Sequence, residues 1–140
     1  MEQQSILKEK IAVLEPKLSI RVLPDTPIKT AMELMIKHKI GAVLVVDENQ
    51  LIGIFTERDV VTKIANQFTD LANQPISDFM TPNPMALHVN HTIAFALNRM
   101  ADGGYRHIPI IDDLNHPTGI ISVRDIIRYI DSRWLDGPAY

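Results

Sequence analysis

The sequence GIFTERD at residues 53–59 returns as GIISVRD at residues 119–125. The same order of motifs precedes each copy: IKTAMELM (28–35) and VLVVD (43–47) before the first, IAFALNRM (93–100) and IPIID (108–112) before the second. The chain therefore contains two copies of one sequence pattern. Such an internal repeat constrains the fold more strongly than any single element does. In the second copy the turn between the last two strands is one residue longer, at a polar stretch suited to a hairpin.

Each copy predicts the order strand, helix, strand, strand, helix. The helix at 28–35 carries one apolar stripe, with Ile28, Ala31, Met32 and Met35 at helical spacing. Runs of β-branched residues predict buried strands. The expected strands are Ser19–Leu23, Val43–Val46 and Leu51–Phe55 in the first copy, and Met85–Val89, Ile108–Ile111 and Thr118–Ile121 in the second. Thr56 and Ser122 are the expected N-caps of the second helices.

The predicted organisation has five parts: an N-terminal helical segment (1–18), a first repeat (19–66), a connector (67–84), a second repeat (85–131) and a C-terminal tail (132–140). Ile6, Ile11 and Leu14 suggest that the first segment is an amphipathic helix, and the connector is expected to hold one helical turn around Ile76–Met80. Neither repeat has enough strands to bury a sheet alone. We therefore expect an α/β fold in which two pseudo-twofold-related β-α-β-β-α repeats pack through their sheets.

Composition excludes several classes of protein. The 140 residues are 46% hydrophobic and 22% charged, as in an ordinary single domain. A formal net charge of −3 offers no positive field for nucleic acid. Without cysteine there are no disulfides or thiolate metal sites. No apolar run reaches the roughly 18 residues of a membrane span, and the N-terminus lacks a signal pattern, so a cytoplasmic protein without membrane contact is expected.

The repeated strand-to-helix junction is the main candidate site. Backbone N–H groups at a helix start attract phosphate, and Asp59 or Asp125, three residues after the N-cap hydroxyl, has a carboxylate that can accept two hydrogen bonds from the vicinal hydroxyls of ribose. The same spacing also makes a capping box, which stabilises a helix by about 1 kcal/mol and needs no ligand. Arg58 and Arg124 fit either phosphate contact or a solvated surface.

The duplicated pattern Gly-x-x-[Ser/Thr]-x-Arg-Asp, with the connector sequence ISDFMTP at 76–82, resembles a tandem pair of CBS domains, or Bateman module. The resemblance covers residues from about 19 to 131. It implies a regulatory sensor that binds an adenine nucleotide (AMP, ADP or ATP) or S-adenosylmethionine and signals to a partner protein. We predict no enzyme activity and no catalytic cofactor, because no catalytic arrangement stands above chance.

The resemblance also implies how two clefts are assembled, each from the junction of one repeat and the opposite repeat's helix start and second strand. Site A would join Ser122, Arg124 and Asp125 to Thr26, Ile40, Gly41 and Ala42. Site B would join Thr56, Arg58 and Asp59 to Asn90, Tyr105, Arg106 and His107. Gly41 also fits a plain strand start, and Arg106 and His107 also fit solvated positions.

Other features are weaker. His88 and His91 lie on a strand-to-turn segment with no carboxylate ligand nearby, so no metal site is predicted. Gly103-Gly104 lacks the Lys-[Ser/Thr] of a phosphate loop and fits a helix end. The second helices carry more apolar residues than two sheets need, which predicts a homodimer; they are Val60, Val61, Ile64, Ile126, Ile127 and Ile130. Trp134 and Tyr140, near the C-terminus, are expected to pack against a neighbour. The alternative function is a structural dimerisation module with vestigial clefts.

Overall fold

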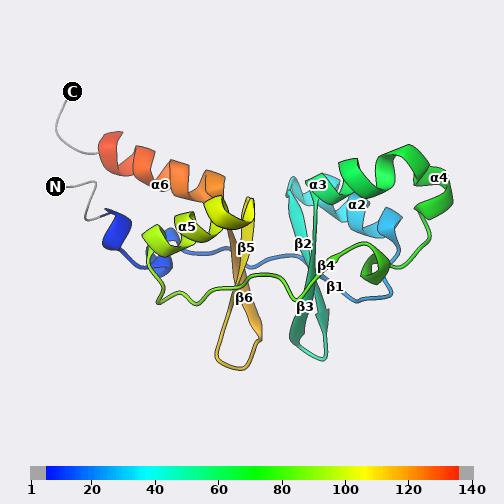
Figure 1. Cartoon of the computed structure of the whole chain (residues 1–140), viewed down its shortest axis with the longest axis horizontal. Helices are drawn as coiled ribbons and strands as arrows, with labels where there is room; N and C mark the ends of the chain where they lie inside the picture. Colours follow the sequence, from blue (N-terminus) through cyan, green and yellow to red (C-terminus); the bar gives the residue numbers. More distant parts are fainter. Residues whose placement is uncertain (1–5, 136–140) are drawn as a thin grey trace. The chain divides into compact units, whose positions relative to one another are not determined.

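A computed structural model describes residues 6–135, with side chains to Arg133 (Figure 1). The chain divides into two compact units. One unit contains the first repeat and the connector, residues 19–84, and adds the turn at 113–117. The other contains the rest of the second repeat and adds the N-terminal segment through Leu18. The expected packing of Trp134 and Tyr140 is not tested, because Tyr140 and the Trp134 side chain lie outside the described part of the chain.

The first-repeat unit is built on a sheet with the strand order β1-β2-β3-β4 (Figure 1). The strands are β1 (Arg21–Val22), β2 (Ala42–Asp47), β3 (Gln50–Thr56) and β4 (Thr81–Pro82). Strand β1 runs parallel to β2, and the other neighbours are antiparallel. The β2–β3 hairpin matches the predicted pair of strands. Strand β1 is shorter than the predicted Ser19–Leu23, because regular pairing with β2 covers two residues there.

Helix α2 (Ile28–His38) buries Ile28, Ala31 and Met35, three of the four residues of the predicted stripe, in the core of this unit. No side chain caps its start at Pro27. Instead, the backbone N–H groups of Ile28 and Lys29 donate to connector carbonyl groups at 2.9 Å each. The connector thus supplies the acceptors that a capping side chain would otherwise provide.

The helical segment after β3 is irregular. It consists of α3 (Glu57–Asp59), a π-helix η2 (Val60–Ile64), a 3-10 helix η3 (Ala65–Gln67) and α4 (Phe68–Leu71). The 3-10 helix η4 (Ile76–Asp78) follows and lies where a helical turn was predicted. The change from α to π winding begins immediately after Asp59, the acid of the junction motif.

The second-repeat unit contains α5 (Ile93–Gly103), β5 (His107–Ile111), β6 (Pro117–Ser122) and α6 (Val123–Leu135), with β5 and β6 forming a two-stranded sheet. The predicted strand Met85–Val89 is wrong as a regular strand. Leu87 alone makes a parallel bridge to Ile110, through hydrogen bonds from the Leu87 N–H to the Pro109 carbonyl and from the Ile111 N–H to the Leu87 carbonyl.

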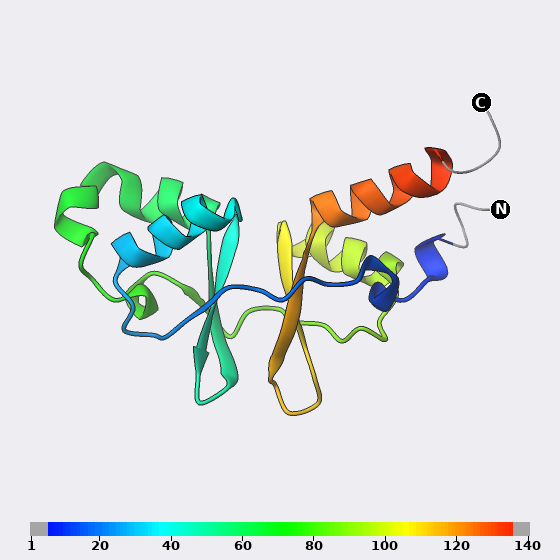
Figure 2. The same ribbon diagram turned by 180° about the vertical axis from the view of Figure 1, so that it is seen from behind.

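The N-terminal segment packs on this second unit, where Figure 2 shows it running beside α5 and β6. It is not the single helix expected: residues 6–8 form one helical turn, and the 3-10 helix η1 covers Ile11–Leu14. The Ile11 and Ala12 N–H groups donate to the His91 and Val89 carbonyls at 2.8 and 3.1 Å, which a continuous α-helix would not allow. Ile6 and Ile11, two of the apolar residues that suggested an amphipathic helix, are nevertheless buried in the core of this unit.

Glu9 fastens the same segment to α6. Its carboxylate accepts hydrogen bonds from the Tyr129 hydroxyl at 3.0 Å and from Arg133 at 2.8 Å. The hydrogen bond to Glu9, and secondarily that to Tyr129, raises the pKa of Arg133 above its ordinary value. The guanidinium therefore stays charged at any physiological pH. Among the described residues, no helix is both long and apolar enough to cross a membrane.

Candidate functional site

Both predicted junctions form as capped helix starts. In the first, the Thr56 hydroxyl oxygen accepts from the Asp59 N–H at 3.3 Å, while Asp59 Oδ2 accepts from the Thr56 N–H at 2.9 Å. In the second, Ser122 Oγ accepts from the Asp125 N–H at 3.2 Å, and Asp125 Oδ2 accepts from the Ser122 N–H at 2.8 Å. Helix capping alone accounts for the presence of the hydroxyl and the carboxylate in the motif. The cap also holds the carboxylate at the end of each strand.

The start of the second strand lies beside the junction of its own repeat. In the first unit, the Glu57 N–H donates to the Gly41 carbonyl at 3.0 Å, and Ala42 pairs with Thr56. In the second, the Val123 N–H donates to the Arg106 carbonyl at the same distance. Ile40–Ala42 and Tyr105–His107 are thus brought to the two junctions within each unit. The pairing of each junction with the opposite repeat stays a prediction.

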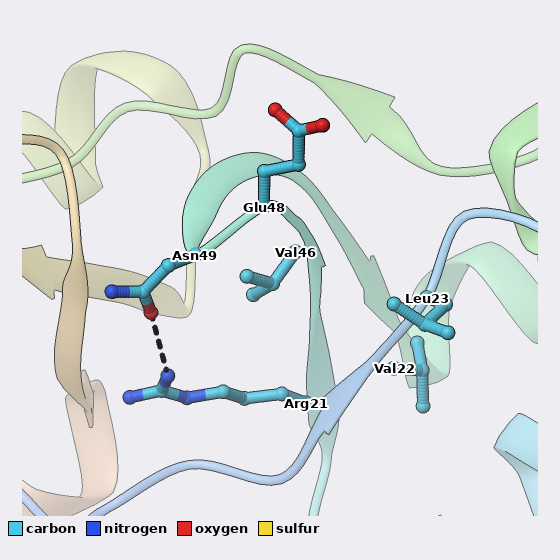
Figure 3. Close-up of a pocket in the computed structure, with 6 residues that line it drawn as sticks. All are labelled: Arg21, Val22, Leu23, Val46, Glu48 and Asn49. Carbon is cyan, nitrogen blue, oxygen red and sulfur yellow. Dashed lines mark hydrogen bonds between the residues drawn. The ribbon is translucent and has the colours of Figure 1, made fainter.

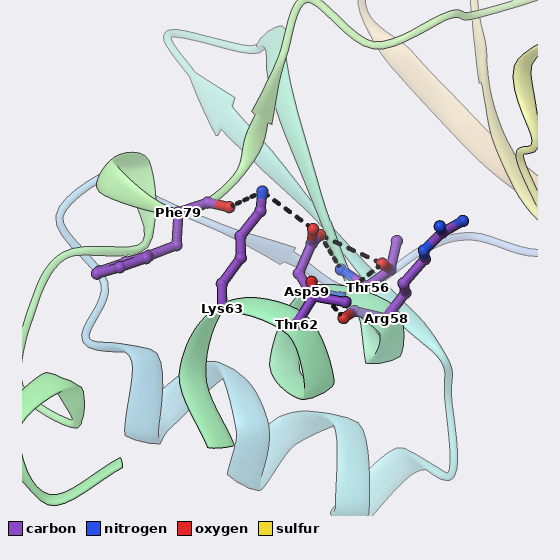
Figure 4. Close-up of polar contacts among 6 residues, drawn as sticks. All are labelled: Thr56, Arg58, Asp59, Thr62, Lys63 and Phe79. Carbon is purple, nitrogen blue, oxygen red and sulfur yellow. Dashed lines mark hydrogen bonds and ion pairs between the residues drawn. The ribbon is translucent and has the colours of Figure 1, made fainter. Parts of the chain in front are cut away.

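The remaining candidates take up varied positions. Thr26 accepts, through its carbonyl, from the Ile76 N–H at 2.8 Å and is half-buried. Asn90 and Tyr105 are exposed, the first in the turn before α5 and the second just after α5. Arg58 and Arg124 are exposed as well, and Figure 4 shows the Arg58 guanidinium extending away from Asp59.

Sequence reasoning missed Lys63. Its ammonium group lies 3.1 Å from Asp59 Oδ1 and donates to the Phe79 carbonyl at 2.8 Å (Figure 4). An acid followed four residues later by a lysine is a familiar helical ion-pair spacing, and this signal was available in the sequence. Asp59 is also the one charged residue among the described residues that is buried, with 8% of its surface exposed.

The two histidines are used locally. His91 Nδ1 accepts from the His88 N–H at 3.0 Å, and the His91 ring stacks on Phe95 with centroids 5.0 Å apart. The part of the chain that the structure describes contains no cluster of three metal-ligating side chains. His91 therefore acts as a turn-stabilising residue ahead of α5.

A shallow pocket of about 270 Å³ lies elsewhere in the first unit (Figure 3). Its lining residues are Arg21, Val22, Leu23, Val46, Glu48 and Asn49. The Arg21 guanidinium donates to Asn49 Oδ1 at 3.4 Å and to the Pro117 carbonyl. The pocket borders the β2–β3 turn, whereas Ala42 and Thr56 are paired at the other end of the hairpin. No junction residue lines it, and we place the candidate site at the junctions for their chemistry.

Two α/β units that repeat one order of elements, each with a capped strand-to-helix junction, define a class of tandem-repeat α/β protein. The sequence pattern of the CBS domain family matches residues 19–66 and 76–132. The chain therefore belongs to the CBS-domain family, and both the resemblance and the tandem α/β fold class are confirmed. Proteins of this family are generally regulatory.

The chain is similar in sequence to proteins from several organisms. An uncharacterized 17.7 kDa protein of Acidianus ambivalens is 34% identical over 108 residues, which are 76% of this chain and 64% of that protein. The CBS-domain protein ATU1752 of Agrobacterium tumefaciens is 33% identical, with a TM-score of 0.77 over 86% of this chain and 97% of that one. The chain spans less than two thirds of several curated relatives.

A further solved structure holds ligands. It is the CBS domain pair of protein MJ0100, in complex with 5′-methylthioadenosine and S-adenosyl-L-methionine. That pair is 25% identical to this chain, with a TM-score of 0.78 over 86% of this chain and 98% of that one.

Proposed function

We propose that this chain is a regulatory module that binds an adenine nucleotide or a related adenosyl ligand and signals its presence to a partner protein. The observation that carries the proposal is the duplicated junction, in which Asp59 and Asp125 each stand at a strand end beside an N-cap hydroxyl. The adenosyl ligands of the MJ0100 domain pair support the same class of ligand.

The chemistry of the junction suits a nucleoside. A carboxylate accepts hydrogen bonds from both vicinal hydroxyls of ribose, and the N–H groups at the start of a helix favour an anionic phosphate or carboxylate group. Asp125 offers such an acceptor, because it is half-exposed and its Oδ1 has no partner among the described residues. We propose that the residues of sites A and B, as grouped by the family resemblance, complete the two clefts.

The proposed module does no chemistry of its own. We also propose a cytoplasmic location. Exposed apolar side chains at Val61 and Ile127, 71% and 59% accessible, support a homodimer formed through the second helices. The competing function is a dimerisation module with vestigial clefts. It is supported by the helix caps, because capping accounts for the junction residues without a ligand.

Isothermal titration calorimetry with AMP, ATP and S-adenosylmethionine tests the proposal on wild type, Asp59→Ala and Asp125→Ala. Asp131→Ala is the matched control, since that carboxylate is exposed on α6 and has no hydrogen bond or ion pair with another described residue. At 100 times its dissociation constant a ligand stabilises the fold by about 2.7 kcal/mol per site, roughly 10 °C in melting temperature.

Loss of a junction carboxylate should remove most of the ligand response of its site. If the junctions are only helix caps, the two variants lose about 1 kcal/mol of stability and no protein responds to ligand. Absence of binding to wild type at millimolar ligand would overturn the proposal in favour of the dimerisation module.

A further inference from the structure

The two junctions carry the same motif but differ one turn beyond it. Asp59 is followed four residues later by Lys63, whose ammonium contacts Asp59 Oδ1 at 3.1 Å and the Phe79 carbonyl at 2.8 Å. Figure 4 shows the lysine side chain reaching between the two acceptors. Lys63 therefore ties the junction acid to the connector segment that follows η4.

The remaining acceptor positions of Asp59 are also used. Its Oδ2 accepts from the Thr56 N–H at 2.9 Å and from the Thr56 hydroxyl at 3.2 Å. Both carboxylate oxygens thus have protein donors, and one of these donors is a cation. The side chain of Asp59 is 11% exposed, against 39% for that of Lys63.

The second junction lacks this arrangement. The residue four positions after Asp125 is Tyr129, whose hydroxyl binds Glu9 rather than the junction acid. Asp125 Oδ2 accepts from the Ser122 N–H, and Oδ1 has no partner in the described part of the chain. Among the described residues, the second carboxylate therefore keeps one uncommitted oxygen.

We infer that Lys63 sets an affinity difference between the two junctions. With the lysine present, the Asp59 junction binds an adenosyl ligand more weakly than the same junction would without it. This inference rests on the proposed function. A ribose hydroxyl that donates to Asp59 Oδ1 competes with an ammonium group, which is the stronger donor for a carboxylate. Binding there must displace or share Lys63, whereas no cation among the described residues pairs with Asp125.

The size of the effect follows from the ion pair. A partly exposed pair at this helical spacing contributes little, so its removal should tighten binding at the Asp59 junction by roughly two- to fivefold. The change is measured in an Asp125→Ala background, in which the Asp59 junction alone keeps its carboxylate. The comparison is therefore Asp125→Ala against Asp125→Ala with Lys63→Met.

The probe is 5′-methylthioadenosine, whose lack of charge removes any direct attraction between ligand and lysine. Calorimetry should give a dissociation constant roughly two- to fivefold lower in the double variant. Lys63→Arg in the same background keeps the cation and should restore the weaker binding. Lys37→Met, at an exposed residue of α2 without a recorded side-chain contact, should leave affinity unchanged. Circular dichroism melting confirms that each variant is folded.

Salt supplies a second readout that a purely structural role would not move. Raising ionic strength from about 0.01 M to about 1 M shortens the screening length from roughly 30 Å to 3 Å, which weakens the partly exposed ion pair. Binding to Asp125→Ala should therefore tighten with salt relative to Asp59→Ala, which reports on the second junction. Lys63→Met should abolish that difference.

The outcomes separate this inference from the proposed function. Suppose that wild type binds the probe, but that Asp125→Ala and Asp125→Ala with Lys63→Met bind it with equal affinity or not at all. This result overturns the role of Lys63 and leaves the proposed function standing. Equal gains from Lys63→Met and Lys63→Arg also overturn it, because the arginine keeps the charge. Failure of every protein to bind the probe, AMP, ATP or S-adenosylmethionine overturns both.

Discussion

Replacement of Ile11 by alanine should destabilise the protein strongly, although Ile11 lies outside both repeats. The side chain is fully buried in the core of the second-repeat unit, and its N–H donates to the His91 carbonyl at 2.8 Å. Truncation of a buried isoleucine to alanine costs about 2 to 5 kcal/mol, from lost burial and the cavity left behind. For a chain of 140 residues this corresponds to a fall of roughly 7 to 20 °C in melting temperature.

Differential scanning calorimetry provides the measurement, with Leu7→Ala as the matched control. Leu7 belongs to the same segment but is 39% exposed, so its truncation should cost about 1 kcal/mol or less. If Ile11→Ala lowers the melting temperature no more than Leu7→Ala does, the N-terminal segment is not part of the second unit's core, and that assignment is wrong.

The ends of α5 yield two further predictions. Gly104 terminates α5 at a φ of 70°, so Gly104→Ala should lower stability by about 1 kcal/mol and Gly104→Asn by less; equal losses in urea unfolding would contradict the backbone explanation. Thr92 caps the start of α5 by accepting from the Phe95 N–H at 3.1 Å, so Thr92→Ala should also cost about 1 kcal/mol and Thr92→Ser much less. Thermal melts that rank Thr92→Ser with Thr92→Ala would show that the hydroxyl is not the cap.

The features that sequence predicted well are local or repeated ones. The hairpin β2–β3 follows from two β-branched runs around a polar turn, and both N-caps follow from a hydroxyl three residues before an acid. The repeat itself supplied the order of elements, because two copies of one pattern constrain each other. These signals depend on neighbouring residues and not on distant contacts.

The features that sequence missed depend on tertiary hydrogen bonds. The turn at 113–117 joins the first-repeat unit because Leu51 and Asn115 exchange hydrogen bonds, with the Leu51 N–H donating to the Asn115 carbonyl at 3.2 Å and Asn115 Nδ2 donating to the Leu51 carbonyl at 3.1 Å. Likewise, nothing in the apolar spacing of Ile6, Ile11 and Leu14 indicated that backbone donors would turn to the segment before α5. Lys63 was visible as an i, i+4 partner, but its contact with Phe79 was not.

The segments that precede the two repeats pair with β-strands at equivalent positions. In the first unit, Thr81 pairs with Ile54 of β3, and the chain then continues into the second repeat. In the second unit, Lys17 pairs with Ile120 of β6, and the chain then continues into the first repeat. Ile54 and Ile120 hold the same position after the glycine of the duplicated motif. In each unit, the segment that leads into the other repeat therefore pairs at an equivalent position, on β3 in the first unit and on β6 in the second.

This register explains the glycine that opens GIFTERD and GIISVRD. A Cβ at Gly53 would overlap the Met80 side chain, and one at Gly119 would lie 3.0 Å from both the Lys17 carbonyl oxygen and Pro16 Cβ. The two glycines therefore leave room for the segments that precede the repeats, at Met80 and at Pro16–Lys17. This packing role does not depend on a ligand. Within the duplicated motif, ligand binding is therefore indicated by the hydroxyl and the carboxylate and not by the glycine. Substitutions at Asp59 and Asp125 consequently discriminate between the two functions, whereas substitutions at the glycines do not.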